Sequence, residues 1–130
     1  MKIVTLSLLQ YLQDNGLGVL DHNLFWEKLG LGLDGLYITD LGTNQNRGLM
    51  HRITYEMFSR DKDDLVAFTK LQQVANFLQD SYEVCRLPAV PQYGAEMIKN
   101  VTIMPPSAIT NAGEDTNGHI IYSLNGSIIY

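Results

Sequence analysis

The chain has 130 residues, of which 45% are hydrophobic and 18% charged, and its formal net charge is -5. This composition fits one globular domain and excludes a largely disordered chain. The acidic balance and the scattered basic residues argue against a protein that is held on nucleic acid by clustered Lys and Arg.

The amino-terminal third predicts a helix followed by two strands. The helix is expected over Ile3 to Gln13, where leucines form an apolar face and Asn15-Gly16 provides a stop. Strands are expected at Asn23 to Leu29 and at Leu36 to Thr39. The polar segment Thr43 to Gly48 is expected to be an exposed loop.

The middle of the chain predicts a strand that leads directly into the main helix. From His51 to Arg60 apolar and polar residues alternate with period two, and a helix is expected over Asp61 to Asp80. Aspartates at its start oppose the helix dipole, and Ser59 or Asp61 is expected to cap the free amides. A buried stripe is expected at spacings of three and four residues: Phe68, Leu71, Val74, Ala75 and Leu78. The other face has an uncharged row that suits a packed interface: Gln72, Gln73, Asn76 and Gln79.

The carboxyl-terminal third predicts further strands broken by prolines. Strands are expected at Tyr82 to Leu87 and at Met97 to Met104, and Ser107 to Gly118 is expected to be a second polar loop. Asn125-Gly126 is a hairpin signal, but its arms would be short, so we expect one long strand over Ile120 to Tyr130. The prediction is a single α+β domain over residues 1–130, with one mostly antiparallel or mixed sheet of about five strands packed against two helices.

No group of residues predicts catalysis, a cofactor or a metal site. Gly30-Leu-Gly-Leu-Asp-Gly35 has the glycine spacing of a dinucleotide-binding loop, but a strand follows it where a helix is required, so a turn or bulge is expected. The three histidines are far apart in sequence, and the aspartates at the main helix lack the Gly and Glu of a calcium loop. Cys85 is the only cysteine, which excludes an intrachain disulfide. No stretch approaches the ~20 apolar residues that span a bilayer. We therefore expect a non-enzymatic protein away from the membrane.

The order of these pieces resembles the tail terminators of tailed bacteriophages, a family of neck proteins often labelled minor capsid proteins. The resemblance rests on the amino-terminal helix Thr5-Leu-Ser-Leu-Leu-Gln-Tyr-Leu12 and on a strand that ends in Asp40-Leu-Gly42. It continues with Ile53-Thr-Tyr-Glu-Met-Phe-Ser-Arg-Asp61 leading into the main helix, and with a closing segment Asp115-Thr-Asn-Gly-His-Ile-Ile-Tyr-Ser-Leu124. The segments Leu29 to Gly35 and Pro88 to Ala95 have no counterpart in that pattern.

The resemblance implies a structural virion protein, assembled in the host cytoplasm and resident in the tail or neck. It implies a homo-oligomeric ring, a hexamer, on the head-proximal end of the tail, which stops polymerisation of the major tail tube protein. The ring would present a surface to the head-completion or connector protein, and DNA would only pass through its lumen. The two polar loops are then candidates for these contacts, through Asp40, Thr43, Asn44, Gln45, Asn46, Arg47, Glu114, Asp115, Thr116 and Asn117. Acidic residues suited to a channel for DNA are Asp34, Asp40, Glu114 and Asp115.

Other functions remain open at this point. A head-completion or adaptor protein beneath the portal is the alternative within the same class. A small-ligand domain that uses the glycine-rich turn would gain thermal stability from its ligand. A cytosolic protein-binding module would form a tight pair with one partner and no ring.

Overall fold

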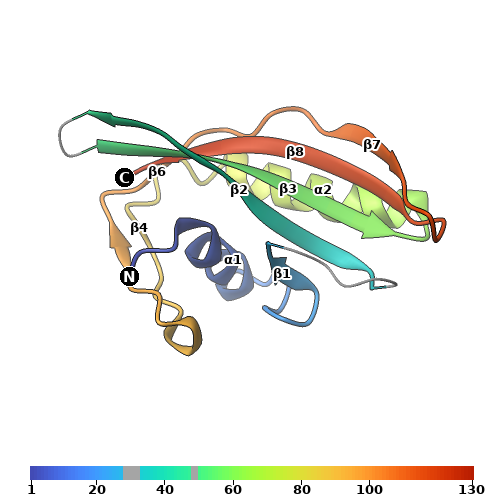
Figure 1. Ribbon diagram of the computed structural model, residues 1–130, viewed down its shortest axis with the longest axis horizontal. Coiled ribbons are helices and arrows are strands. Elements are labelled where there is room, and N and C mark those ends of the chain that lie inside the picture. The colour runs from blue at the N-terminus through green and yellow to red at the C-terminus, as the bar shows by residue number, and fades with distance from the viewer. Residues whose placement is uncertain (28–32, 48–49) are drawn as a thin grey trace.

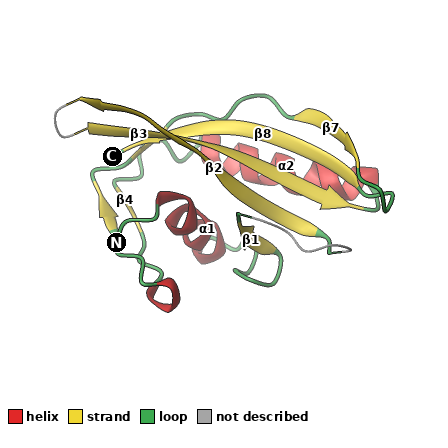
Figure 2. Ribbon diagram, viewed as in Figure 1, coloured by secondary structure: helices red, strands yellow, loops and turns green. Residues whose placement is uncertain are grey.

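The computed structural model of the protein describes residues 1–27, 33–47 and 50–130, with the backbone alone for 43–47 and 50. Helices and strands follow in the order α1 (Val4–Asp14), β1 (Leu24–Trp26), β2 (Gly35–Arg47), β3 (Met50–Asp61), α2 (Asp64–Gln79), β4 (Arg86–Leu87), a short 3-10 helix (Pro91–Tyr93), β5 (Ile98–Lys99), β6 (Thr102–Ile103), β7 (Thr110–Glu114) and β8 (Ile120–Ile129). Figure 2 shows that strands dominate the described chain.

The main sheet has the order β1-β2-β3-β8-β6, and β7 also pairs with β8. Every pairing in it is antiparallel except β1 with β2, which is parallel. The two short strands β4 and β5 pair separately. The long strands β2, β3 and β8 form a curved sheet that runs the length of the molecule (Figure 1). The expected α+β class and the mixed sheet are confirmed.

Both helices pack against one face of this sheet. On β3, Ile53, Tyr55 and Met57 are buried, while the residues between them are half-buried or exposed, as the period of two predicts. Leucines of α1 and the inner side of α2 belong to the same core cluster as these residues. The helices also touch each other, since the rings of Tyr11 and Phe77 lie 5.2 Å apart. Each buried apolar side chain contributes about 1.5–3 kcal/mol of burial free energy.

The main helix begins later than the sequence suggests. Its N-cap is Asp63, whose side chain accepts hydrogen bonds from the backbone amides of Leu65 and Val66, so the expected cap by Ser59 or Asp61 was wrong. Ala67 is buried, whereas Phe68 is 38% exposed at the edge of the buried face, where its ring packs against Tyr122. Phe68 therefore leaves the predicted buried stripe, whose other members are buried as expected.

Both expected polar loops contain strands. Residues of the segment Thr43 to Gly48 extend β2 as far as Arg47, paired with β3, with register shifts that indicate bulges. The segment Ser107 to Gly118 contains β7, which pairs with β8. Polar strands form here because the long neighbouring strands supply backbone partners whatever the side chains are.

Two other expected strands are shorter than predicted. Only Arg86–Leu87 of the segment Tyr82 to Leu87 is a strand. The segment Met97 to Met104 is divided into β5 and β6, because Asn100 has a φ of 59°, which interrupts an extended strand. The last segment is one long strand, β8, with no turn at Asn125-Gly126, as expected. In the described chain, no helix combines the length and the apolar character that crossing a bilayer requires.

Candidate assembly surfaces

The first group of predicted interface residues lies on β2. Asp40 is exposed, and its carboxylate accepts a hydrogen bond of 2.6 Å from the backbone amide of Gly42, beside the first bulge. The backbone of Thr43 to Arg47 continues along β3, and Arg47 lies opposite Met50. The side chains of Thr43, Asn44, Gln45, Asn46 and Arg47 lie outside the described residues.

The second group lies at the turn between β7 and β8. Glu114 is the last residue of β7, and Asp115 accepts hydrogen bonds of 2.9 Å from the backbone amides of Asn117 and His119. Thr116 and Asn117 are exposed at the tip of this turn. The Asp115 side chain thus shapes the turn that presents its neighbours to solvent.

The structure does not bring these two groups together. The first group ends at Arg47, which pairs with Met50 at the start of β3. The second group begins at Glu114, which pairs with Ile120 of β8, and Ile120 pairs with Asp61 at the end of β3. Met50 and Asp61 are eleven positions apart along β3. At about 3.3 Å per residue, the two ends are roughly 35 Å apart. They are therefore parts of two different surfaces.

Ionisable side chains gather around the buried His119 beside the β7–β8 turn. His119 is 1% exposed, and its Nε2 lies 3.2 Å from Asp34 while its Nδ1 lies 3.4 Å from Asp115. Arg60 lies 3.9 Å from Asp115, and its guanidinium donates to the carbonyl of Leu33. The cluster joins the start of β2, the end of β3 and the β7–β8 turn, which are far apart in sequence.

The pKa of Asp115 lies below its ordinary value. The main cause is the hydrogen bond from the backbone amide of His119, and the backbone amide of Asn117 and the charge of His119 act in the same direction, against a smaller opposing effect of burial. The sequence did not predict that His119 belongs to this cluster. No local signal could have found it, because Asp34 and His119 are 85 positions apart.

Of the four acidic residues expected to line a channel, three lie at this end of the sheet. Asp34 and Asp115 both contact His119, and Glu114 lies next to Asp115 in the chain. Asp40 pairs in register with Tyr55, six residues along β3 from Asp61. The carboxylates of Asp34 and Asp115 are thus engaged with a histidine, whereas Glu114 is exposed.

The outer face of α2 is an exposed surface without charge over most of its length. Leu65 is 71% exposed at its amino end, and Phe68 follows one turn later, edge-on to the ring of Tyr122 at 5.4 Å. Further along, the side-chain amide of Gln72 donates to Asn76 over 2.8 Å. Beside this row runs a groove of about 360 Å³, closed on its other side by the 106–109 segment. Three members of the uncharged row predicted from sequence, Gln72, Asn76 and Gln79, therefore line this groove, whereas Gln73 lines a different hollow beside Lys70.

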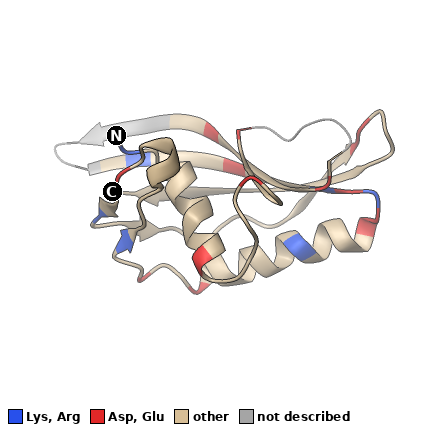
Figure 3. Ribbon diagram, turned by 90° about the horizontal axis from the view of Figure 1, so that it is seen from below, with Lys and Arg blue, Asp and Glu red and all other residues tan. Residues whose placement is uncertain are grey.

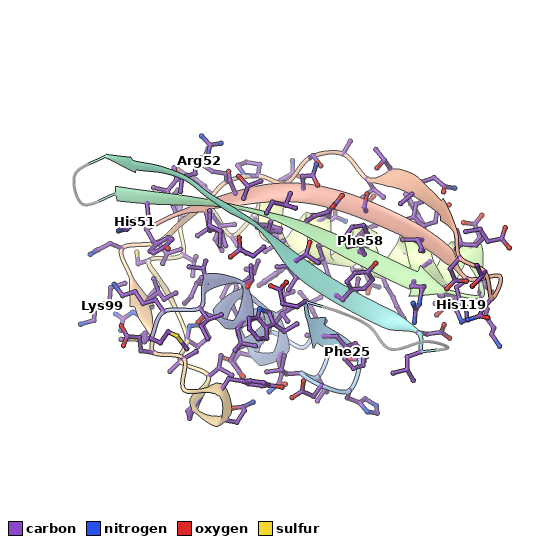
Figure 4. The ribbon with its side chains drawn as sticks, in the orientation of Figure 1. Phe25, His51, Arg52, Phe58, Lys99 and His119 are labelled. Atoms are coloured by element: carbon purple, nitrogen blue, oxygen red, sulfur yellow. The ribbon has the colours of Figure 1, made fainter. Side chains whose placement is uncertain are left out.

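A hollow with a basic rim lies near the two termini. Its volume is about 550 Å³, and its lining includes Lys2, Lys99 and the pair His51 and Tyr130, whose rings stack at 5.2 Å. Both lysines are exposed. In Figure 4, His51, Arg52 and Lys99 lie at one end of the ribbon and His119 at the other.

The glycine-rich segment is described only in part. Gly30 and Gly32 lie outside the described residues. Gly35 begins β2 at a φ of 154°, and a Cβ at this position would lie 3.0 Å from the carbonyl oxygen of Asn23. Because glycine has no side chain, the backbone of β2 can pass close to the segment that leads into β1.

No model of a known protein family matches this sequence, and no curated protein matches it.

Proposed function

We propose that the protein is a structural component of a tailed-phage virion that assembles with copies of itself into a ring at the head-proximal end of the tail. There it would stop the polymerisation of the tail tube and offer the surface to which the head connector joins. The observation that carries this proposal is the outer face of α2, which is uncharged along its groove and exposes Leu65 and Phe68 in its first two turns.

An exposed leucine beside an exposed phenylalanine favours a protein contact over free solvation. Leu65 and Phe68 are one helical turn apart, so both project from the same side of α2. Apolar and aromatic side chains of this kind supply much of the free energy at protein interfaces, while neutral amides such as Gln72 and Asn76 can form hydrogen bonds around them without the cost of desolvating a charge. This pattern supports an assembly role.

The order of elements adds separate support. A helix, then strands β2 and β3, then the main helix, and a long closing strand follow the sequence pattern by which the chain resembles tail terminators. A closed ring needs two different complementary surfaces on each subunit. The opposite ends of this elongated sheet provide room for two such surfaces (Figure 1).

Electron microscopy of particles made without this chain tests the proposal. Overlong tail tubes beside filled, unjoined heads are the expected result. Tails of normal length that fail to join heads would instead place the protein at the portal as an adaptor. Normal infectious particles would contradict both positions.

A point substitution tests the α2 surface itself. Leu65→Asp should abolish incorporation into particles or weaken self-association by about tenfold or more, because a charge would enter an apolar contact. Val19→Asp is the matched control, since Val19 is 50% exposed on a loop near β1. Equal behaviour of the two variants would show that the outer face of α2 makes no contact.

A further inference from the structure

Charge is distributed unevenly along the long axis of the protein. Lysines of the basic hollow lie near the two termini, and Asp and Glu lie at the amino end of α2 and at the β7–β8 turn, with further carboxylates spread along the chain (Figure 3). The antiparallel register fixes this separation. Thr102 of β6 and Arg52 of β3 flank Ile129 at one end of β8, and Glu114 of β7 and Asp61 of β3 flank Ile120 at the other.

The basic hollow combines positive charge with an apolar wall. Lys2 and Lys99 line it and are exposed, and Ile129 and Tyr130 provide half-buried apolar surface between them. No Asp or Glu is among its described lining residues, and the nearby Glu96 carboxylate pairs with the amino terminus at 3.1 Å. Two lysines are too few for a groove that tracks a nucleic-acid backbone, which requires a run of phosphate contacts. The hollow fits a compact acidic surface that also carries an apolar side chain.

The opposite end of the protein has this composition. Asp63 and Asp64 begin α2 and are followed directly by Leu65, the exposed leucine at the amino end of the helix. Glu114 is exposed and lies near Asp64. Glu114 pairs with Ile120 on β8, and Tyr122, two residues further along that strand, donates a hydrogen bond from its hydroxyl to Asp64. We call the set Asp63, Asp64, Leu65 and Glu114 the acidic knob.

The acidic knob cannot reach the basic hollow of its own chain. The residues Ile120 and Ile129 mark the two ends of β8, which spans ten residues. At about 3.3 Å per residue this is roughly 30 Å, well beyond contact between charges and beyond the ~10 Å screening length at moderate salt. Only a second molecule can bring the two surfaces together.

We propose that the acidic knob of one copy binds in the basic hollow of the next, in a head-to-tail contact. Leu65 packs against Ile129 and Tyr130, while Asp64 and Glu114 face Lys2 and Lys99. The contact joins two different patches, so it repeats from subunit to subunit and builds a ring when the rotation closes. This inference rests on the proposed assembly function and specifies the surfaces that carry it.

Sedimentation velocity of charge-reversed variants tests the contact. At low ionic strength the wild-type chain should associate in a concentration-dependent way, and added salt should weaken the association. Lys99→Glu and Glu114→Lys should each weaken it by about tenfold, a factor that corresponds to about 1.4 kcal/mol. Lys62→Glu is the matched control: it changes the net charge as Lys99→Glu does, but at the acidic end, so it should not weaken the contact.

Mixing the two variants gives the sharpest result. The Lys99→Glu chain keeps an intact knob, and the Glu114→Lys chain keeps an intact hollow. Each variant alone should associate about tenfold more weakly than the wild type, and the equimolar mixture should form a dimer with wild-type affinity, because one native contact can still form. A contact that involves only the hollow or only the knob of each copy would not be restored in this way.

Several results would overturn the inference. One is association that survives both reversals, and another is equal weakening by Lys62→Glu and Lys99→Glu. A third is a wild-type chain that stays monomeric at about 1 mM, because a contact of even about −4 kcal/mol would be half formed at that concentration. A fourth is binding of duplex DNA that Lys99→Glu abolishes. Such results leave the proposed function standing if particles made without the chain still have overlong tails. Normal particles would remove the proposed function itself.

Discussion

Gly126 on β8 lies opposite Tyr55 on β3, and the absence of a side chain at Gly126 makes room for the phenol ring. A Cβ at this position would overlap the hydroxyl end of Tyr55 and lie 2.9 Å from Cε1. Tyr55 is fully buried, and burial raises the pKa of its hydroxyl well above the ordinary value. The glycine in Asn125-Gly126 therefore serves close packing inside a strand, although the same dipeptide often forms a hairpin turn.

Gly126→Ala should destabilise the protein by about 1–3 kcal/mol, because the added methyl group overpacks the core. The cost should fall in a Tyr55→Phe background, since the hydroxyl is the part of the ring nearest to the new methyl group. Chemical denaturation of the four members of this double-mutant cycle measures the coupling. Asn125→Ala, at the exposed neighbour, is the control, and equal costs in both backgrounds would contradict the packing account.

Tyr55→Phe alone should be neutral or slightly stabilising. The Tyr55 hydroxyl is buried and has no hydrogen-bond partner among the described residues. A buried polar group without a partner costs about 1–3 kcal/mol of desolvation, which the substitution removes. Thermal unfolding checks this, and a clear loss of stability would show that the hydroxyl has a partner.

Asp63→Ala should cost about 1 kcal/mol of stability, because α2 would lose its N-cap. The side chain of Asp63 accepts from the amides of Leu65 at 3.0 Å and Val66 at 3.3 Å. Asp63→Asn keeps an acceptor oxygen without the charge and should retain most of the stability. Urea unfolding of both variants separates capping from charge, and an equal loss in both would assign the effect to the charge.

Thr5→Val should destabilise the packing of α1 on β1. The indole Nε1 of Trp26 donates to the hydroxyl of Thr5 over 2.9 Å, and Thr5 is 1% exposed. Without that acceptor the half-buried indole N–H loses its partner, at a cost of about 1–3 kcal/mol. Trp26 is the only tryptophan, so its fluorescence reports the change directly. Thr5→Ser keeps the hydroxyl and should behave like the wild type apart from a small packing loss.

Stability should fall in acid partly through Asp115. Its folded-state pKa lies below the ordinary value of 3.8, chiefly because the backbone amide of His119 donates to it. The unfolded chain then binds more protons in this range, so the contribution is present above about pH 4 and is lost as the pH falls through the folded-state pKa. Asp115→Asn should flatten the dependence of unfolding free energy on pH below about pH 4. An unchanged slope would show that the Asp115 hydrogen bonds do not favour its charged form.

Some of the fold could be predicted because the signals were local. Alternation along Ile53, Tyr55 and Met57 predicted the inner face of β3, and leucines at helical spacing predicted α1. The α+β class followed from the number and order of such segments. These patterns reflect a single element against one core, so no knowledge of distant residues is needed.

Other parts could not be predicted because they depend on pairing between distant segments. The polar backbone of Thr43 to Arg47 becomes a strand only because β3 lies beside it, and β7 forms only against β8. Phe68 lies at the edge of the buried face because its ring packs against Tyr122 of β8, 54 positions away. In each case a long-range partner outweighed local composition.

The sequence by itself determined the class of fold, the inner faces of its main elements and the uncharged row on α2, because periodicity and side-chain chemistry are properties of the chain. Only the tertiary structure decided which charges meet. It placed His119 between Asp34 and Asp115, exposed Leu65 at the tip of the acidic end, and set the basic hollow at the far end of β8. Such contacts follow from strand register and loop closure, and spacing along the chain does not encode them.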